Sequence, residues 1–377
     1  MRTHITVSLV LATCLILVSG CGKPQGSAPD ARLTAEVQRL GLPEVLARAR
    51  QEATAQPTAE SFDYLARALA LSKQPKPART AIEKAVSLDP NYEPSATVLA
   101  QALMQEGKDE AASQMMRGLL QKKPDASLAS EVLCRVLLKQ RKPSEAVTAA
   151  DEALKHDARS GKLLWARADA KAALKQFDEA EKDYRRAMKL EPKNVPVRMG
   201  YVQSLMRAGK QEEGTKFAEE TVSMAPNSAD VRFMAASALH QAGKLDEALK
   251  EYKEALIINP AMIPAANNLA LLLADRQQDC TTAVAWARKA SVMAPRSVAV
   301  ADTLGWALAR DGQYSDAANV LRSVNKAWTN NPTVWYHLGW TLAKSGNKGE
   351  GVSLLQRAAD SGGEVAAEAL KALQEVR

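Results

Sequence analysis

Histidine and cysteine, the residue types that most often carry chemistry, are few in this chain and widely spaced. Its 377 residues include four histidines and four cysteines. No two histidines have the spacing of metal ligands, and the Gly-rich phosphate and dinucleotide motifs and the Gly-x-Ser-x-Gly nucleophile motif do not occur. We therefore expect no metal, no cofactor, no small-molecule substrate and no enzymatic activity.

One cysteine, Cys21, does lie in a context that implies chemistry. An apolar run over residues 5–18 is too short for a membrane span and leads into Leu-Val-Ser-Gly-Cys at 17–21. This resembles the bacterial lipobox, which implies that residues 1–20 are a lipoprotein signal peptide and that Cys21 is lipidated. Because Gly22 follows rather than aspartate, the analogy with Gram-negative lipoproteins implies an outer-membrane anchor facing the periplasm. The alternative is an ordinary secretory signal with an incidental cysteine.

Two short segments separate this start from the rest of the chain. Residues 21–31 are rich in Gly, Pro and Ser, which predicts a flexible tether. Residues 32–58 have helical periodicity without a full repeat pattern, so we expect a helical cap or a half-repeat there.

Residues 229–262 show how the remaining chain is built. Apolar residues at helical spacing predict a helix over 229–241, which Gly243 ends in a left-handed conformation. We expect Asp246 to cap a second helix and Pro260 to stop it. Two helices this short cannot bury their apolar faces alone, so the unit needs copies of itself.

The copies recur about every 34 residues. Positions 8 and 20 of the unit are small in nearly every copy, as close helix crossings require, and one extra residue near Asp279 is expected to lengthen the turn of the seventh copy. The nine copies are 59–92, 93–126, 127–160, 161–194, 195–228, 229–262, 263–297, 298–331 and 332–363. A helix over 364–377, with Ala367, Leu370 and Leu373 on its apolar face, is expected to cap the array.

This pattern resembles the tetratricopeptide repeat. The resemblance implies an all-α solenoid, a right-handed superhelix of antiparallel helix pairs that binds protein partners. In such an array Cys134 is a small packing residue, about four repeats from Cys280, so we expect both thiols to be free. The net charge of +7 is a mild bias over this length and does not indicate a nucleic-acid partner.

The resemblance also implies which residues face a partner. Five positions of each first helix line the concave groove of such superhelices, and here they carry large apolar and basic side chains. The candidate groove residues are Arg135, Lys139, Lys162, Trp165, Met199, Arg207, Phe233, His240, Asn267, Trp306, Arg310, Tyr336 and Trp340. Trp306 and Trp340 have an alternative role in packing against the next helix. No lysine occupies position 5, so the carboxylate clamp of some chaperone adaptors is not expected.

The last two copies suggest a pathway. Asp302, Leu304, Gly305 and Trp306 form a motif that resembles repeats of lipoproteins from exosortase and exopolysaccharide export systems. The resulting expectation is a membrane-anchored interaction scaffold of the bacterial envelope, accessory to such export. Alternatives are accessory roles in pilus assembly, outer-membrane-protein assembly or peptidoglycan synthesis.

Overall fold

The structure, a computed structural model, describes residues 28–376, and every regular element within them is an α-helix. No helix in this part of the chain is long and apolar enough to cross a membrane. The helices are α2 (Ala28–Leu40), α3 (Leu42–Ala55), α4 (Ala59–Leu71), α5 (Pro75–Leu88), α6 (Glu93–Gln105), α7 (Asp109–Lys122), α8 (Ser127–Lys139), α9 (Pro143–His156), α10 (Gly161–Ala173), α11 (Phe177–Leu190), α12 (Val195–Arg207), α13 (Gln211–Met224), α14 (Ala229–Gln241), α15 (Leu245–Ile258), α16 (Ile263–Arg276), α17 (Cys280–Met293), α18 (Val298–Arg310), α19 (Tyr314–Ala327), α20 (Pro332–Lys344), α21 (Lys348–Ala359) and α22 (Glu364–Val376). The expectation of an all-α repeat solenoid is confirmed.

Small residues hold the two helices of each pair close together. The residues at position 8 of the repeat are buried, and Ala66, Ala236 and Ala270 have no exposed surface. Ala248, at position 20, is equally buried. Gly243 has φ +77° and turns the chain from α14 into α15, which confirms the prediction made for this residue. A large side chain at positions 8 or 20 would therefore force the helices apart.

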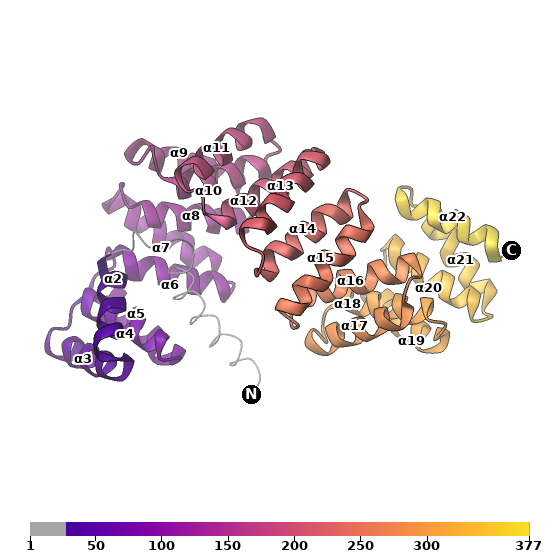
Figure 1. The fold of residues 1–377 in the computed structure, drawn as a ribbon, viewed down its shortest axis with the longest axis horizontal. Helices are drawn as coiled ribbons and strands as arrows, with labels where there is room; N and C mark the ends of the chain where they lie inside the picture. The colour runs from indigo at the N-terminus through magenta and orange to yellow at the C-terminus, as the bar shows by residue number, and fades with distance from the viewer. Residues whose placement is uncertain (1–27, 377) are drawn as a thin grey trace. The chain divides into compact units, whose positions relative to one another are not determined.

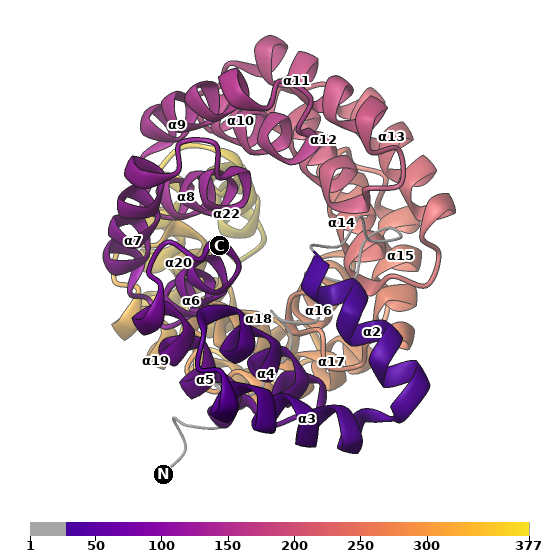
Figure 2. The same cartoon turned by 90° about the vertical axis from the view of Figure 1, so that its left-hand side faces the viewer.

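The part of the chain that the structure describes divides after Lys210 into two compact units. In the first unit, α4, α6, α8, α10 and α12 form one layer in which successive members contact each other (Figures 1 and 2). The helices α5, α7, α9 and α11 form a second layer that packs against the first (Figure 2). We call these the inner and outer layers.

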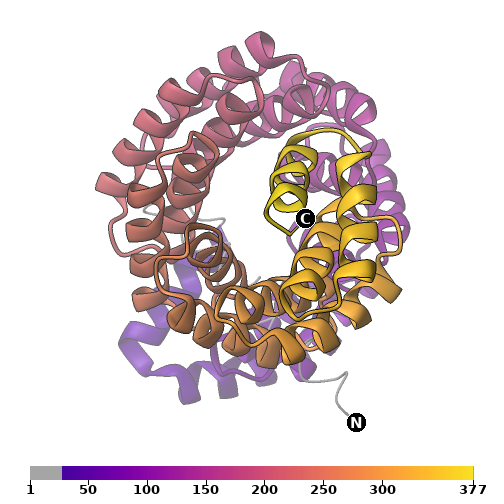
Figure 3. The same ribbon diagram turned by 90° about the vertical axis from the view of Figure 1, so that its right-hand side faces the viewer.

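The second unit repeats this arrangement. Its inner layer contains α14, α16, α18, α20 and α22, and its outer layer contains α13, α15, α17, α19 and α21 (Figures 1 and 3). The final helix, α22, packs on both α20 and α21, as the first helix of a further pair would. It therefore extends the inner layer.

Several sequence-based expectations were wrong in detail. Helix α2 begins at Ala28, so the predicted tether is wrong for residues 28–31. Asp246 is not a cap: Lys244 precedes α15, and Asp246 lies in its first turn and pairs with Arg276 Nη1 at 2.5 Å. Cys21 and the predicted signal peptide lie outside the described residues.

The extra residue of the seventh copy is in a helix. Helix α16 has 14 residues, whereas the other inner-layer helices of the repeats have 13. It ends at Arg276, and the next residue, Gln277, has a φ of +51° and supplies the left-handed residue that Gly243 supplies one pair earlier. The turn to α17 therefore keeps the length found between α14 and α15.

The buried face of α22 is also shifted by one residue from the prediction. Ala366, Ala369, Leu373 and Val376 are buried, whereas Leu370 is 51% exposed. The face that contains Ala367 is solvent-exposed and lines a cleft together with residues of α16, α18 and α20.

Candidate functional site

In the first unit, the basic candidate residues form ion pairs on the inner layer. Arg135 and Lys162 both approach Glu131, at 3.6 Å and 3.9 Å. Both cations remain exposed, and Arg207 on α12 is exposed as well. These residues come from α8, α10 and α12, and they give the face a mixed charge.

Two of the predicted groove cations bind helix ends instead. Lys139 Nζ donates to the carbonyl of Met104 and pairs with Asp109 at 2.7 Å. Arg310 Nε donates to the carbonyl of Ala274 at 3.3 Å. Both carbonyls lie in the last turn of the preceding inner helix, where backbone oxygens lack helical partners and a cation is favoured. Lys139 and Arg310 thus tie successive inner helices together.

Trp165 lies in a tight cluster on α10 and α12. A Cβ placed on Gly200 would lie 3.1 Å from Asp169 Oδ1 and 3.2 Å from Trp165 Nε1, so the missing side chain leaves room for both. Tyr184 Oη donates to Asp169 at 2.5 Å, and burial raises the pKa of Asp169 to about 6. Trp165 is half-buried, and its Nε1 makes no well-aligned hydrogen bond within the described residues. Met199, also half-buried, precedes Gly200.

In the second unit, Phe233 and His240 lie around Tyr252, and Asn267 is on the next inner helix, α16. The ring of Phe233 is 6.0 Å from that of Tyr252, and His240 meets the same ring edge-on at 6.2 Å. Burial lowers the pKa of His240, so the ring is neutral at pH 7. Asn267 Oδ1 is buried and has no hydrogen-bond partner among the described residues. All three predicted residues are only partly exposed here.

The second unit contains a cleft of about 1000 Å³. Four inner-layer helices, α16, α18, α20 and α22, build it. Its lining combines an aromatic floor with charged walls: Leu271, Asp275, Gln277, Asp302, Trp306, Arg310, Thr333, Tyr336, His337, Trp340, Lys344, Glu364, Val365, Ala367, Glu368, Lys371, Ala372 and Glu375. We call it the inner cleft.

Hydrogen bonds and stacking fix the floor of the inner cleft. The indole of Trp306 stacks on His337 at 4.3 Å and donates from Nε1 to Asp275 at 2.7 Å. His337 Nδ1 lies 3.1 Å from both carboxylate oxygens of Asp302, so its N–H faces the carboxylate. Trp340 meets Trp306 edge-on at 5.4 Å, completing a rigid aromatic layer.

Burial distinguishes packing residues from exposed ones on this floor. Trp306 is 2% exposed and Trp340 is 7% exposed, and Arg310 lies over both indoles at about 5 Å. These tryptophans pack, which is the alternative that the sequence left open. Tyr336 is only partly buried and faces the cleft, so it is the aromatic side chain of the floor that a ligand can reach.

Negative charge surrounds Tyr336. Burial and then the carboxylate of Glu368 raise the pKa of Tyr336 to about 12, and Asp275 and Glu375 add to this while Arg310 opposes it. Five carboxylates line the cleft, against three side chains of lysine and arginine. The cleft therefore favours a cationic group lying over an aromatic ring.

The sequence reasoning missed the acidic wall. Glu364, Glu368 and Glu375 come from α22, which was predicted only as a cap. The signal was the spacing of these glutamates on the face that carries Ala367. Asp275 occupies position 13 of the seventh copy, which is a groove position, but it was missed because the groove was described by its large apolar and basic side chains.

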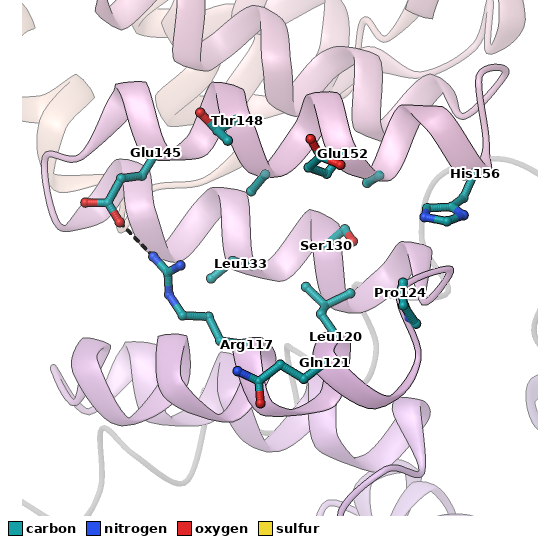
Figure 4. A pocket seen from close by; sticks show the side chains of 12 residues that line it. Arg117, Leu120, Gln121, Pro124, Ser130, Leu133, Glu145, Thr148, Glu152 and His156 are labelled. Carbon is teal, nitrogen blue, oxygen red and sulfur yellow. Dashed lines mark hydrogen bonds and ion pairs between the residues drawn. The ribbon is translucent and has the colours of Figure 1, made fainter.

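A second hollow, of about 500 Å³, lies in the first unit between the outer helices α7 and α9 (Figure 4). Leu120 and Leu133 form its floor, and Arg117 crosses it to Glu145 at 2.7 Å (Figure 4). It holds none of the predicted groove residues.

Residues 28–376 contain no group of three or more His, Cys, Asp or Glu side chains placed to hold a metal ion. The absence of metal, cofactor and enzymatic activity from the protein stays a prediction. Cys134 and Cys280 are both free thiols, as expected, and burial raises the pKa of Cys134 to about 12.

Comparisons with known proteins agree with this architecture. Family models described as tetratricopeptide repeat match residues 97–162, 132–195, 172–237, 229–262 and 303–375, more than half of the chain together. A tetratricopeptide repeat protein from Parabacteroides merdae is 16% identical, with a TM-score of 0.50 over 66% of this chain and 98% of that chain. Human IFIT1, solved as a dimer with PPP-AAAA, is 15% identical, with a TM-score of 0.53 over 89% of this chain and 85% of that one. At these identities the likeness concerns the fold alone, and no curated protein matches the sequence.

Proposed function

Because the chain belongs to the tetratricopeptide repeat family, whose members serve as protein–protein interaction scaffolds, we propose that its inner cleft binds an extended peptide segment with a basic side chain. The observation that carries the proposal is the partly exposed ring of Tyr336 in a cleft that Glu368, Glu375 and Asp275 also line. A lysine or arginine of the peptide lies over this ring and pairs with the carboxylates. The extended backbone then follows the exposed polar groups of the inner layer.

The rigid floor explains how the cleft could be selective. Trp306 donates its N–H to Asp275 and stacks on His337, which in turn pairs with Asp302, before a ligand arrives. Little ordering cost therefore remains at binding. Lys344 and Lys371 lie at the rim, where they disfavour a second basic residue close to the first. The preferred segment therefore has one basic residue with uncharged or acidic neighbours.

Selection from a random peptide display library on the immobilised full chain tests this function. Peptides that survive should carry a lysine or arginine and should be lost when Tyr336→Ala replaces the wild type. Leu370→Lys is the matched control, because Leu370 is on α22 but does not line the cleft. Equal recovery on Tyr336→Ala and wild type would exclude the cleft as the binding site.

We further propose that the scaffold is a lipoprotein of the bacterial envelope, anchored through Cys21 in the outer membrane and facing the periplasm. The lipobox-like sequence that ends at Cys21 supports this. Cys21→Ser should then move the chain from the membrane fraction to the soluble fraction when the membranes are washed in high salt, which weakens electrostatic binding to lipid. A chain that stays in the salt-washed membrane fraction without Cys21 would contradict the lipid anchor.

The pathway that we favour is exopolysaccharide or exosortase-type export. The Asp302–Trp306 motif supports it by resemblance, and accessory roles in pilus, outer-membrane-protein or peptidoglycan assembly are the alternatives. A deletion strain should secrete less polymer and regain secretion with the wild-type gene. Normal polymer secretion by the deletion strain would count against this pathway.

A further inference from the structure

Two aliphatic side chains on the outer layer of the second unit are unusually exposed. Ile257 is 71% exposed and Val292 is 81% exposed. They are the thirteenth residues of α15 and α17, two outer helices of equal length in successive pairs. Equal positions on equivalent helices point the same way, so both side chains project from one face.

This exposure departs from the pattern of the other pairs. The thirteenth residues of the remaining full-length outer helices are polar: Ser87, Gln121, Lys155, Lys189, Ser223 and Lys326. An exposed aliphatic residue has no role in packing within its own pair, so the position is otherwise kept polar. Only the sixth and seventh copies place apolar groups there.

Basic residues run beside the two aliphatic side chains. One turn before them, at the ninth position of α15, α17 and α19, are Lys253, Arg288 and Arg322. Lys289 and Lys326 add two more charges, and all five side chains are exposed. In the first unit the ninth position carries Glu83, Arg117, Asp151 and Arg185, with no sign in common.

Most of these cations form no ion pair within the described residues, and the exposed carboxylate of Asp279 interacts electrostatically with Lys253. Arg322 pairs with Glu350 at 2.9 Å, but Lys253, Arg288, Lys289 and Lys326 form no ion pair with a carboxylate among residues 28–376. Glu254 is the one acidic residue between Lys253 and Ile257 on α15, and it is partly buried. The face therefore presents apolar tips within a field of positive charge.

We propose that this basic apolar face, formed by Lys253, Ile257, Arg288, Lys289, Val292 and Lys326, docks on an anionic phospholipid surface. The aliphatic tips enter the boundary between headgroups and acyl chains, and the cations lie at the level of the phosphates. A second copy of the chain is disfavoured, because a two-fold contact would place the same cations against each other. A nucleic acid would use the cations and leave Ile257 and Val292 in water.

The inference is independent of the inner cleft and of the lipid on Cys21. The face belongs to outer helices α15, α17 and α19, whereas the cleft belongs to inner helices. A lipid anchor would only raise the local concentration of the face near a bilayer. A failure of peptide binding would leave the proposal standing, and the reverse also holds.

Site-specific photo-crosslinking on vesicles tests the proposal. The full chain carries p-benzoyl-phenylalanine at Ile257 or Val292, with Lys189 as the matched control at the thirteenth position of α11. Vesicles contain phosphatidylcholine alone or with about a quarter of phosphatidylglycerol, which supplies the surface potential that attracts basic residues. The adducts are measured as phospholipid bound to the chain or as a crosslinked dimer of the chain.

We expect phospholipid adducts at positions 257 and 292 to exceed those at 189 several-fold on the anionic vesicles. The excess should fall on neutral vesicles, in high salt and in Lys253→Glu with Arg288→Glu, because each lowers the electrostatic attraction. Adducts equal at all three positions would overturn the proposal. So would a crosslinked dimer without lipid adducts, which would assign the face to a second copy.

Discussion

At the scale of single residues, a position in the repeat defines a face of the protein but not the exposure of a side chain. Trp306 and Tyr336 both occupy predicted groove positions, yet Trp306 is 2% exposed while Tyr336 lines the cleft as a reachable surface. The difference arises because His337 stacks on the indole of Trp306 and Asp275 accepts its N–H. These partners lie on neighbouring helices, so spacing within one repeat could not identify them.

Asp169 supplies a prediction at this scale. Its pKa is raised from 3.8 to about 6 by burial, so the native state keeps a proton that the unfolded chain releases at lower pH. The stabilising effect is present below about pH 4 and is lost as the pH rises through about 6. Above that pH the buried carboxylate is charged and lowers the free energy of unfolding.

We therefore expect Asp169→Asn to stabilise the first unit at pH 8 by about 1–2 kcal/mol, since the amide carries no charge and still accepts from Tyr184. At pH 4 the variant and the wild type should have nearly equal stability. Denaturant unfolding at both pH values measures the difference. A variant less stable than wild type at pH 8 would show that the charged form is favoured in the native state.

At the scale of helices, the pairs follow the sequence pattern closely because small residues determine where the two helices of a pair approach each other. The exceptions have physical causes. The extra residue of the seventh copy extends α16, since one more residue in a helix adds a backbone hydrogen bond whereas a longer turn adds none. Helix α22 turns Leu370 to solvent because Ala366, Ala369 and Leu373 fit more closely on α20 and α21.

Two glycines of α21 give a matched pair of substitutions. A Cβ on Gly351 would lie 2.7 Å from the backbone nitrogen of Ala343, whereas one on Gly349 meets nothing within 4 Å. Gly351→Ala should destabilise the second unit by about 1–3 kcal/mol, because backbone cannot move aside cheaply. Gly349→Ala should be neutral or stabilising by about 0.5–1 kcal/mol, because alanine is the better helix former.

Thermal or urea unfolding followed by circular dichroism measures both changes. The two variants have the same composition, so they control for each other. If Gly351→Ala and Gly349→Ala have the same melting temperature, the close approach of α20 and α21 described for this pair is wrong.

At the scale of the whole molecule, the chain is a repeat protein with two compact units. Stability in such arrays is a sum of local terms, because each pair contacts its neighbours. We expect unfolding in urea to deviate from a single two-state transition. Asp169→Asn should shift the part of the unfolding transition that belongs to the first unit. Gly351→Ala should shift the part that belongs to the second unit.

Probes in each unit separate these parts. Trp165 fluorescence reports on the first unit, and Trp306 and Trp340 report on the second, so single-tryptophan variants can follow each. Coincident transitions in both variants would show that the whole chain unfolds as one cooperative body.

Much of the fold was predictable, because the spacing of small residues such as Ala248 and of turn residues such as Gly243 indicates the helix pairs directly. The candidate site was predictable only in part. Tyr336 was identified from its position, while Glu368, Glu375 and Asp275 were not. The first two come from the capping helix, and the third stands at a groove position but is neither large and apolar nor basic. The basic apolar face was missed because only inner-layer positions were considered, although Ile257 and Val292 break the polar pattern of the repeat.

The central claim, that the inner cleft binds a basic peptide through its acidic wall, can be measured directly. A peptide selected by display on the wild-type chain is titrated calorimetrically into wild type, into Glu368→Lys with Glu375→Lys, and into the Leu370→Lys control. We predict that the double reversal weakens Kd about tenfold or more, which corresponds to at least about 1.4 kcal/mol, while Leu370→Lys leaves Kd unchanged. Equal affinity for all three chains, or tighter binding to the double reversal, would contradict the account.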